Sequence, residues 1–162
     1  MNKKGEQSSI SFGGIPADSM KDYTYRSHTL RKVFDAFWRE DVWMLPLTDI
    51  LYDGKSIKNE TVTQAYLNSY SPWFYLELGD LNTFRDELLA AGSPDIECHN
   101  DKGHYLHCYS QTKTCDDLYS FMKPLAFKLD GTTYTVPPEG YTESNTEDGY
   151  KCVVYVSSKF DS

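Results

Sequence analysis

The stretch from Phe127 to Tyr141 constrains the fold most. It reads Phe-Lys-Leu-Asp-Gly-Thr-Thr-Tyr-Thr-Val-Pro-Pro-Glu-Gly-Tyr, with Asp130-Gly131 between two runs in which large and polar residues alternate. An Asp-Gly pair in this setting is the strongest short-range signal for a two-residue hairpin turn. Pro137-Pro138 ends the second run, because proline lacks the amide hydrogen that a central strand needs. The stretch therefore predicts an antiparallel β-hairpin.

A second hairpin signal lies earlier in the chain. The run from Trp43 to Tyr52 leads into Asp53-Gly54, and the pattern predicts a hairpin over Leu51 to Ile57. Upstream, Ile10-Ser11-Phe12 alternates into Gly13-Gly14, which predicts a strand that ends in a bend. Several short strands joined by tight turns indicate antiparallel β structure.

Two segments carry helical signals. In residues 29 to 40, apolar side chains recur at helical spacing, so an amphipathic helix is one interpretation of this segment. The apolar run Pro72 to Leu81 predicts a buried strand. After it, Asn82 or Thr83 could cap a helix that continues to Ala91 and stops at Gly92.

Size and charge limit the classes of function. The chain has 162 residues, enough for one domain, and a net charge of −8, which disfavours a nucleic-acid partner. No apolar run approaches the ~20 residues that a membrane-spanning helix needs. The sequence shows no metal or cofactor motif, so we expect no cofactor.

Four cysteines and one sequon indicate the secretory route. Cys98, Cys108, Cys115 and Cys152 are an even number and allow two disulfides in any of three pairings. Asn59-Glu60-Thr61 is an acceptor for N-glycosylation. The first residues lack the apolar core of a signal peptide, so we expect Met1 not to be the start of the gene product.

Zinc binding is an alternative role for the cysteine-rich region. Cys98, His104, Cys108 and Cys115 could form a tetrahedral site. Such ligands usually occur as close Cys-x-x-Cys pairs, and the sequence has none. We therefore expect no metal here, and exposed or structural roles for the four histidines, which are His28, His99, His104 and His107.

The order of these features resembles the C-terminal lobe of pepsin-like aspartic peptidases. The similar motifs are Phe12-Gly13-Gly14-Ile15, the Trp43 strand, the Asp53-Gly54 hairpin and the final hairpin with Val136-Pro137-Pro138. The resemblance implies an all-β, pepsin-like lobe with one or two short helices, and a strand pair rather than a helix in residues 29 to 40. We expect a polar N-terminal segment (1–9), the lobe (10–158) and a tail (159–162). The lobe is expected to be incomplete, because the closing strands of the family are not recognised after Cys152.

The resemblance also locates the catalytic position. Enzymes of this family hold a water between two aspartates, each in an Asp-Thr-Gly turn, and this chain contains no such triplet. In the family order the turn falls on Glu77-Leu78-Gly79. A glutamate is one methylene longer than an aspartate and would misplace its carboxylate by about 1 Å. We therefore expect no catalytic residue, with Glu77, Leu78 and Gly79 as the degenerate position.

The disulfide pairing is likewise implied by the resemblance. The family has a bridge between a cysteine in this region and one after the Pro-Pro segment, which matches Cys108 and Cys152. Cys98 and Cys115 would then form the second bridge.

We expect a catalytically inactive aspartic-peptidase-like module, which acts by binding or as a structural component of an assembly. Its partner is expected to be a protein or peptide, such as a missing N-terminal peptidase lobe, and its location secreted, extracellular, lysosomal or vacuolar. The alternative is one lobe of an active aspartic endopeptidase whose other lobe is on a separate chain.

Overall fold

The computed structural model describes residues 44–59, 61–67, 71–91, 95–101, 105–144, 146 and 148–158, with the side chains of 100, 101 and 105–107 not described. The expectations for residues 1–43, including the strand at Ile10 and the alternatives for residues 29 to 40, lie outside these ranges. The same holds for Gly92, His28 and His104.

The first sheet is built around the long strand β1. Strand order is β2-β1-β7-β8, and β3 also pairs with β1. The strands are β1 (Met44–Tyr52), β2 (Lys55–Ser56), β3 (Gln64–Tyr66), β7 (Leu125–Leu129) and β8 (Thr132–Val136). Burial alternates along β1 at Leu45 and Leu47 and again at Ile50 and Tyr52, as expected for a strand with one face in the core, and a register shift between Leu47 and Asp49 separates the two halves.

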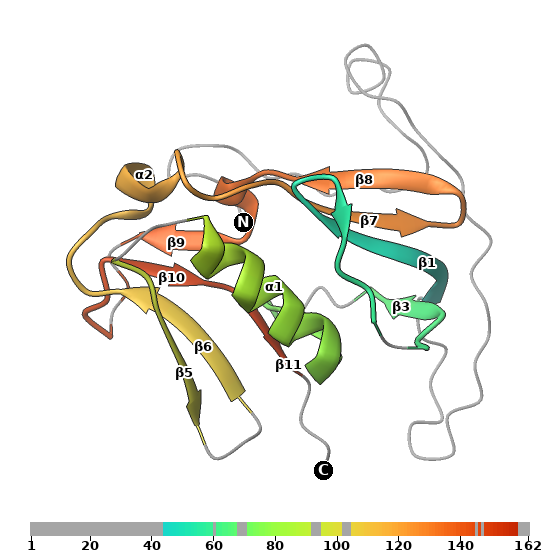
Figure 1. The fold of residues 1–162 in the computed structure, drawn as a ribbon, viewed down its shortest axis with the longest axis horizontal. Coiled ribbons are helices and arrows are strands. Elements are labelled where there is room, and N and C mark those ends of the chain that lie inside the picture. Colours follow the sequence, from blue (N-terminus) through green and yellow to red (C-terminus); the bar gives the residue numbers. More distant parts are fainter. Residues whose placement is uncertain are drawn as a thin grey trace, which may run out of the picture.

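A second sheet lies beside the first (Figure 1). Its strand order is β5-β6-β10-β9, all antiparallel. The strands are β5 (Glu97–Asp101), β6 (Tyr105–Ser110), β9 (Thr142–Ser144) and β10 (Cys152–Val154). A short parallel pair joins β4 (Phe74–Leu76) to β11 (Val156–Ser158). Strands β10 and β11 correct one expectation, because two buried strands do run from Cys152 to Ser158; β10 pairs with β6 and β9, and β11 pairs with β4.

Both predicted hairpins are confirmed. The β7–β8 ladder closes at Asp130-Gly131, and the β1–β2 ladder closes at Asp53-Gly54. The turn residues all have positive φ, between 46° at Asp130 and 76° at Gly131. Such angles at both central positions are those of the turn type that Asp-Gly favours. The described part of the chain is thus mostly strand with few short helices, and the all-β class is confirmed.

Three helical segments occur in the described residues: α1 (Leu78–Ala90), α2 (Cys115–Leu118) and the 3-10 turn η2 (Pro138–Gly140). None of them is long and apolar enough to cross a membrane. The predicted start of the long helix at Asn82 or Thr83 is wrong. The helix begins at Leu78, and Thr83 lies inside it, where its hydroxyl donates to the Gly79 carbonyl at 3.1 Å.

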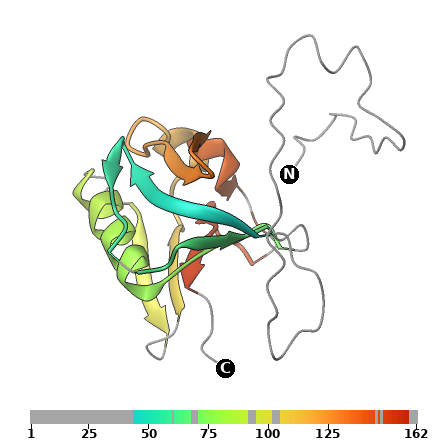
Figure 2. The same cartoon turned by 90° about the vertical axis from the view of Figure 1, so that its right-hand side faces the viewer.

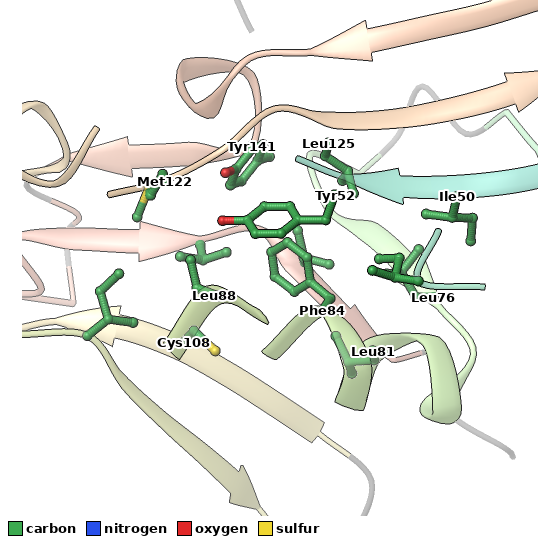
Figure 3. Close-up of a cluster of buried hydrophobic side chains, with 14 of the residues drawn as sticks. Ile50, Tyr52, Leu76, Leu81, Phe84, Leu88, Cys108, Met122, Leu125 and Tyr141 are labelled. Atoms are coloured by element: carbon green, nitrogen blue, oxygen red, sulfur yellow. The ribbon is translucent and has the colours of Figure 1, made fainter. Parts of the chain in front are cut away.

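Helix α1 covers the core with one face, as the two views of the ribbon show (Figure 2). Its buried residues Leu81, Phe84 and Leu88 recur at helical spacing. The Phe84 ring meets the Tyr52 ring edge-on at 5.0 Å and the Tyr141 ring at 6.2 Å (Figure 3). These contacts join α1 to β1 and to the segment before β9, so one core serves both sheets.

The hydroxyls of two buried tyrosines form hydrogen bonds with the backbone of one residue, Lys123. The Tyr141 hydroxyl donates to the Lys123 carbonyl at 2.7 Å, and the Lys123 amide donates to the Tyr52 hydroxyl at 3.1 Å. Burial raises the pKa of both phenols. Both therefore stay neutral and act as structural groups.

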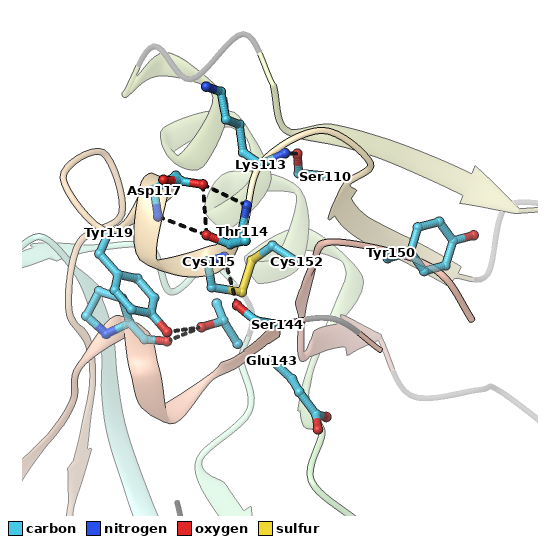
Figure 4. The surroundings of a disulfide bond; sticks show 12 residues. Ser110, Lys113, Thr114, Cys115, Asp117, Tyr119, Glu143, Ser144, Tyr150 and Cys152 are labelled. Atoms are coloured by element: carbon cyan, nitrogen blue, oxygen red, sulfur yellow. Dashed lines mark hydrogen bonds between the residues drawn. A yellow bond between two sulfur atoms is a disulfide. The ribbon is translucent and has the colours of Figure 1, made fainter. Parts of the chain in front are cut away.

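The predicted disulfide pairing is wrong. The structure joins Cys98 to Cys108 and Cys115 to Cys152, with Cα–Cα distances of 4.1 and 4.9 Å. Cys98 and Cys108 are directly opposite each other in the β5–β6 ladder, so strand register brings them together. The second bridge ties the first residue of α2 to the first residue of β10 (Figure 4).

The Asp49 carboxylate joins three strands of the first sheet. It accepts hydrogen bonds from the Ser56 hydroxyl at 2.6 Å and the Lys128 ammonium at 3.1 Å. The bond from Ser56 is the main cause that lowers the pKa of Asp49. A lowered pKa in the folded state means that the stabilisation is present above the unfolded-state pKa of about 3.9, and is lost as pH falls through the folded-state value.

We expect Asp49→Asn to destabilise the fold by about 0.5 to 1 kcal/mol at pH 7, and to have little effect near pH 2, where the wild-type carboxyl is protonated. Chemical denaturation at the two pH values measures this difference. The exposed carboxylate Asp116 provides a control through Asp116→Asn. An equal effect of Asp49→Asn at both pH values would contradict this role.

Candidate functional site

The expected catalytic position lies at the junction of β4 and α1. Glu77 is the N-cap residue of α1 and makes no side-chain capping bond. Glu77 is exposed, and Leu78 is 46% exposed. The strand leads directly into the helix, so Leu78 and Gly79 belong to the first helical turn. The expected glycine turn between strand and helix is therefore absent from this position.

A second acidic residue in the same helical turn, Asp80, has a structural role. Asp80 is 1% exposed, and its carboxylate accepts a hydrogen bond from the Asn59 backbone amide at 2.5 Å. An acid in the first turn also interacts favourably with the positive end of the helix dipole. Asp80 thus anchors the segment after β2 to the start of α1. It is a structural group, unlike an acid that faces a substrate.

The expected glycosylation site touches this same junction. Asn59 is exposed, and its side-chain amide donates to the Thr83 hydroxyl at 2.5 Å and to the Ile57 carbonyl at 3.4 Å. Glycosylation replaces one of the two hydrogens on this nitrogen. The remaining hydrogen could then bond to either the Thr83 hydroxyl or the Ile57 carbonyl. A glycan at Asn59 would project from the surface beside the first turns of α1.

An aromatic group beside β4 was not anticipated from the sequence. The Trp73 ring meets the Tyr155 ring edge-on at 4.9 Å, and the Tyr155 hydroxyl donates to the Glu143 carboxylate. Burial and this bond raise the pKa of Tyr155. Nearby in sequence, Tyr75 is 47% exposed and its hydroxyl lies 3.3 Å from that of Ser71. These groups offer flat apolar surface and hydrogen bonds, which suit binding rather than bond cleavage.

A small cavity of about 220 Å³ lies elsewhere, between the β1–β2 turn and the end of α1. Glu77 does not line it. Its charges are mixed, and the Lys55 ammonium and the Glu87 carboxylate approach to 3.7 Å. The lining residues are Tyr52, Asp53, Lys55, Glu87, Ala90, Ala91 and Lys123.

The cysteine-containing zinc alternative is excluded, because all four cysteines are in disulfides. Among the side chains that the structure describes, no three His, Cys, Asp or Glu are grouped to bind a metal. His99 is exposed and lies 3.2 Å from the Glu97 carboxylate. His107 lies in β6, and its side chain is not described.

The fold and the motif order agree with a comparison of the whole sequence with known families. The model of the family described as eukaryotic aspartyl protease matches residues 1–162. The chain therefore belongs to the pepsin-like aspartic protease family. No curated protein matches the chain.

Proposed function

We propose that this chain is a catalytically inactive member of its family, which binds a protein or peptide partner or serves as a structural component of an assembly. The proposal depends mainly on which residues occupy the expected catalytic position and on how they are placed. The sequence has no Asp-Thr-Gly triplet, and the carboxylate expected to replace the aspartate, Glu77, is an exposed N-cap residue.

The chemistry of the family explains why this matters. Two carboxylates about 3 Å apart share one proton, because two like charges at that distance cannot both ionise. One carboxylate then acts as base on the water and the other as acid on the leaving group. Glu77 offers one carboxylate, and its neighbour Asp80 is occupied by the Asn59 amide. One lobe supplies one carboxylate of that pair, and at this junction Glu77 is an exposed N-cap residue while Asp80 is bonded to the fold, so neither takes the place of the aspartate.

The strands suggest a second position for the degenerate triplet. Asn68-Ser69-Tyr70 follows β3 in the chain, and a strand precedes the triplet in the family. Asparagine has the shape of aspartate and serine has a hydroxyl like threonine, but tyrosine replaces the glycine. These three residues lie outside the described ranges. An asparagine cannot ionise, so this assignment also predicts an inactive lobe.

Exposed apolar side chains support a binding role around this segment. Four large ones fall between residues 66 and 78: Tyr66 (56% exposed), Leu67 (43%), Tyr75 (47%) and Leu78 (46%). These four lie within 13 residues of sequence, and large apolar side chains left in water favour association with a partner that covers them. The proposed partner is a polypeptide that covers these residues.

Two features support a secretory location. Disulfides persist in oxidising compartments, and both bridges of this chain are formed. The sequon asparagine Asn59 is exposed. Secreted, lysosomal and vacuolar locations all fit these two features.

A peptidase assay tests the proposal. The purified chain is incubated with a library of quenched fluorescent peptides between about pH 3 and 6, where shared carboxylates act. The assay is repeated at concentrations high enough to force self-association, because a dimer could bring two copies of Glu77 together. We expect no cleavage above buffer, and no change with Glu77→Gln or Asn68→Ala. Cleavage that either variant abolishes would support the alternative of an active lobe.

A further inference from the structure

Strand β8 is the last strand of the first sheet and pairs along one of its two edges. The order β2-β1-β7-β8 places it at the end of the sheet, and Figure 1 shows it along the rim. Within the described part of the chain, no strand pairs with its outer edge. The edge of a sheet presents backbone donors and acceptors that can bind another strand.

The register of the first sheet shows which backbone groups of β7 face β8. The Ile50 carbonyl accepts a hydrogen bond from the Ile57 amide at 2.9 Å, so the backbone of Ile50 faces β2 and not β7. Phe127 is the residue of β7 opposite Ile50. Because hydrogen-bonded and non-bonded pairs alternate in an antiparallel ladder, the backbone of Phe127 faces β8.

The same alternation identifies the outward groups of β8. Phe127 is opposite Tyr134, so these two residues form a hydrogen-bonded pair. The neighbouring residues Thr133 and Thr135 are in non-bonded pairs, and their N–H and C=O groups point away from β7. Both threonines are exposed.

Strand β8 lacks the devices that protect the edge of a sheet. Charged side chains, prolines and bulges usually block such an edge. The five residues of β8 are Thr-Thr-Tyr-Thr-Val, without a charge or a proline, and all five pair with β7 without a register shift. At the other end of the sheet, β2 has only two residues and carries Lys55, so it is a poor edge for pairing.

The sequence of β8 is nearly the same in both directions about Tyr134. An interface about a two-fold axis uses the same surface on both copies, so that surface must be complementary to itself. Antiparallel pairing centred on Tyr134 sets Thr133 of one copy opposite Thr135 of the other, where their outward backbone groups can bond. No like charges meet, because β8 has no charged residue.

An aromatic row leads to the same axis. Tyr134 is 37% exposed and opposite Phe127, so the two rings lie on one face of the sheet. The Phe127 ring stacks on the Phe74 ring at 5.6 Å with 13° between the planes. Pairing about Tyr134 sets the two tyrosines opposite each other, and cross-strand aromatic pairs stabilise a sheet.

We propose that two copies of this chain pair antiparallel through β8 and form a closed dimer with one continuous sheet. Each Thr133 exchanges backbone hydrogen bonds with Thr135 of the second copy. The short β2 edge does not extend the sheet further, so the assembly ends at two copies. The inference does not rest on the proposed function, because β8 shares no residue with the catalytic position or with the exposed region from 66 to 78.

Sedimentation velocity of the full chain tests the dimer. One strand edge is a small interface, so we expect a weak dimer that forms as the concentration rises from about 10 µM to 1 mM. Thr133→Lys/Thr135→Lys sets like charges opposite each other and should weaken association about tenfold or more. Thr133→Lys/Thr135→Glu sets opposite charges there and should restore it. The control Gln111→Lys/Ser120→Lys adds the same charge at exposed positions outside β8 and should associate like the wild type.

Three outcomes would overturn the proposal. They are a monomer at every concentration, a species larger than a dimer, and wild-type association of the variant Thr133→Lys/Thr135→Lys.

Cross-linking through Tyr134→Cys tests the register and replaces the charge variants if circular dichroism shows that they do not fold. The two copies of position 134 are directly opposite at the axis, with Cβ atoms about 4.5 to 5.5 Å apart. Opposite positions of antiparallel strands can be bridged, as Cys98 and Cys108 are in this chain. Oxidised glutathione should therefore give a covalent dimer of Tyr134→Cys and leave the control Gln111→Cys monomeric. Equal yields from the two variants would also overturn the proposal.

Discussion

Phe84→Ala is expected to destabilise the fold by about 3 to 5 kcal/mol, which is the cost of truncating a fully buried phenylalanine. Phe84 is 0% exposed and contacts the rings of Tyr52 and Tyr141. It thereby connects α1 to β1 and to the segment before β9. Because the free energy of unfolding of native domains is about 5 to 15 kcal/mol, the variant should lose a large part of it. Chemical denaturation monitored by circular dichroism measures the loss.

Leu89→Ala is the matched control for this experiment. Leu89 lies on the same helix but is 39% exposed, so its truncation should change stability by about 0.5 kcal/mol or less. Equal effects of the two variants would contradict the assignment of the inner face of α1.

Removal of the Cys115–Cys152 disulfide is expected to have the other large effect. The bridge spans 37 residues, and the chain-entropy model gives about 4 kcal/mol for a loop of this length. The Cys98–Cys108 bridge spans 10 residues, for which the same model gives about 3 kcal/mol. We therefore expect the double variant Cys115→Ala/Cys152→Ala to unfold at a lower denaturant concentration than Cys98→Ala/Cys108→Ala.

Peptide mapping without reduction checks the pairing on which this comparison depends. Fragments that link Cys98 to Cys108 and Cys115 to Cys152 are expected. Fragments that link Cys108 to Cys152 would restore the pairing implied by the family resemblance and contradict the structure.

Local signals explain why the hairpins were predictable. Asp53-Gly54 and Asp130-Gly131 each need only their own positive φ angles and the strands beside them. The disulfides depend instead on strand register, which places Cys98 opposite Cys108 through contacts along the whole ladder. Cysteine spacing does not contain that information, and the family resemblance suggested a different pairing.

The start of α1 was missed for a similar reason. Leu78 and Gly79 read as the end of an apolar run, and Gly79 disfavours a helix. The helix begins there because Asp80 is buried and accepts the Asn59 amide from a distant segment. No pattern within residues 72 to 91 shows that contact.

The candidate site was predictable in part. The absence of an Asp-Thr-Gly triplet is visible in the sequence. The helical environment of Glu77 became visible only with the fold.

Binding of pepstatin tests whether this chain is an inactive module, because the inhibitor occupies the site between two catalytic carboxylates. Calorimetric titration of the full chain near pH 4, with pepsin as the positive control, measures whether such a pair exists. We expect no saturable binding to this chain, while pepsin binds tightly. Stoichiometric, tight binding that is lost at neutral pH would contradict an inactive module and show that the chain contains a working pair of carboxylates.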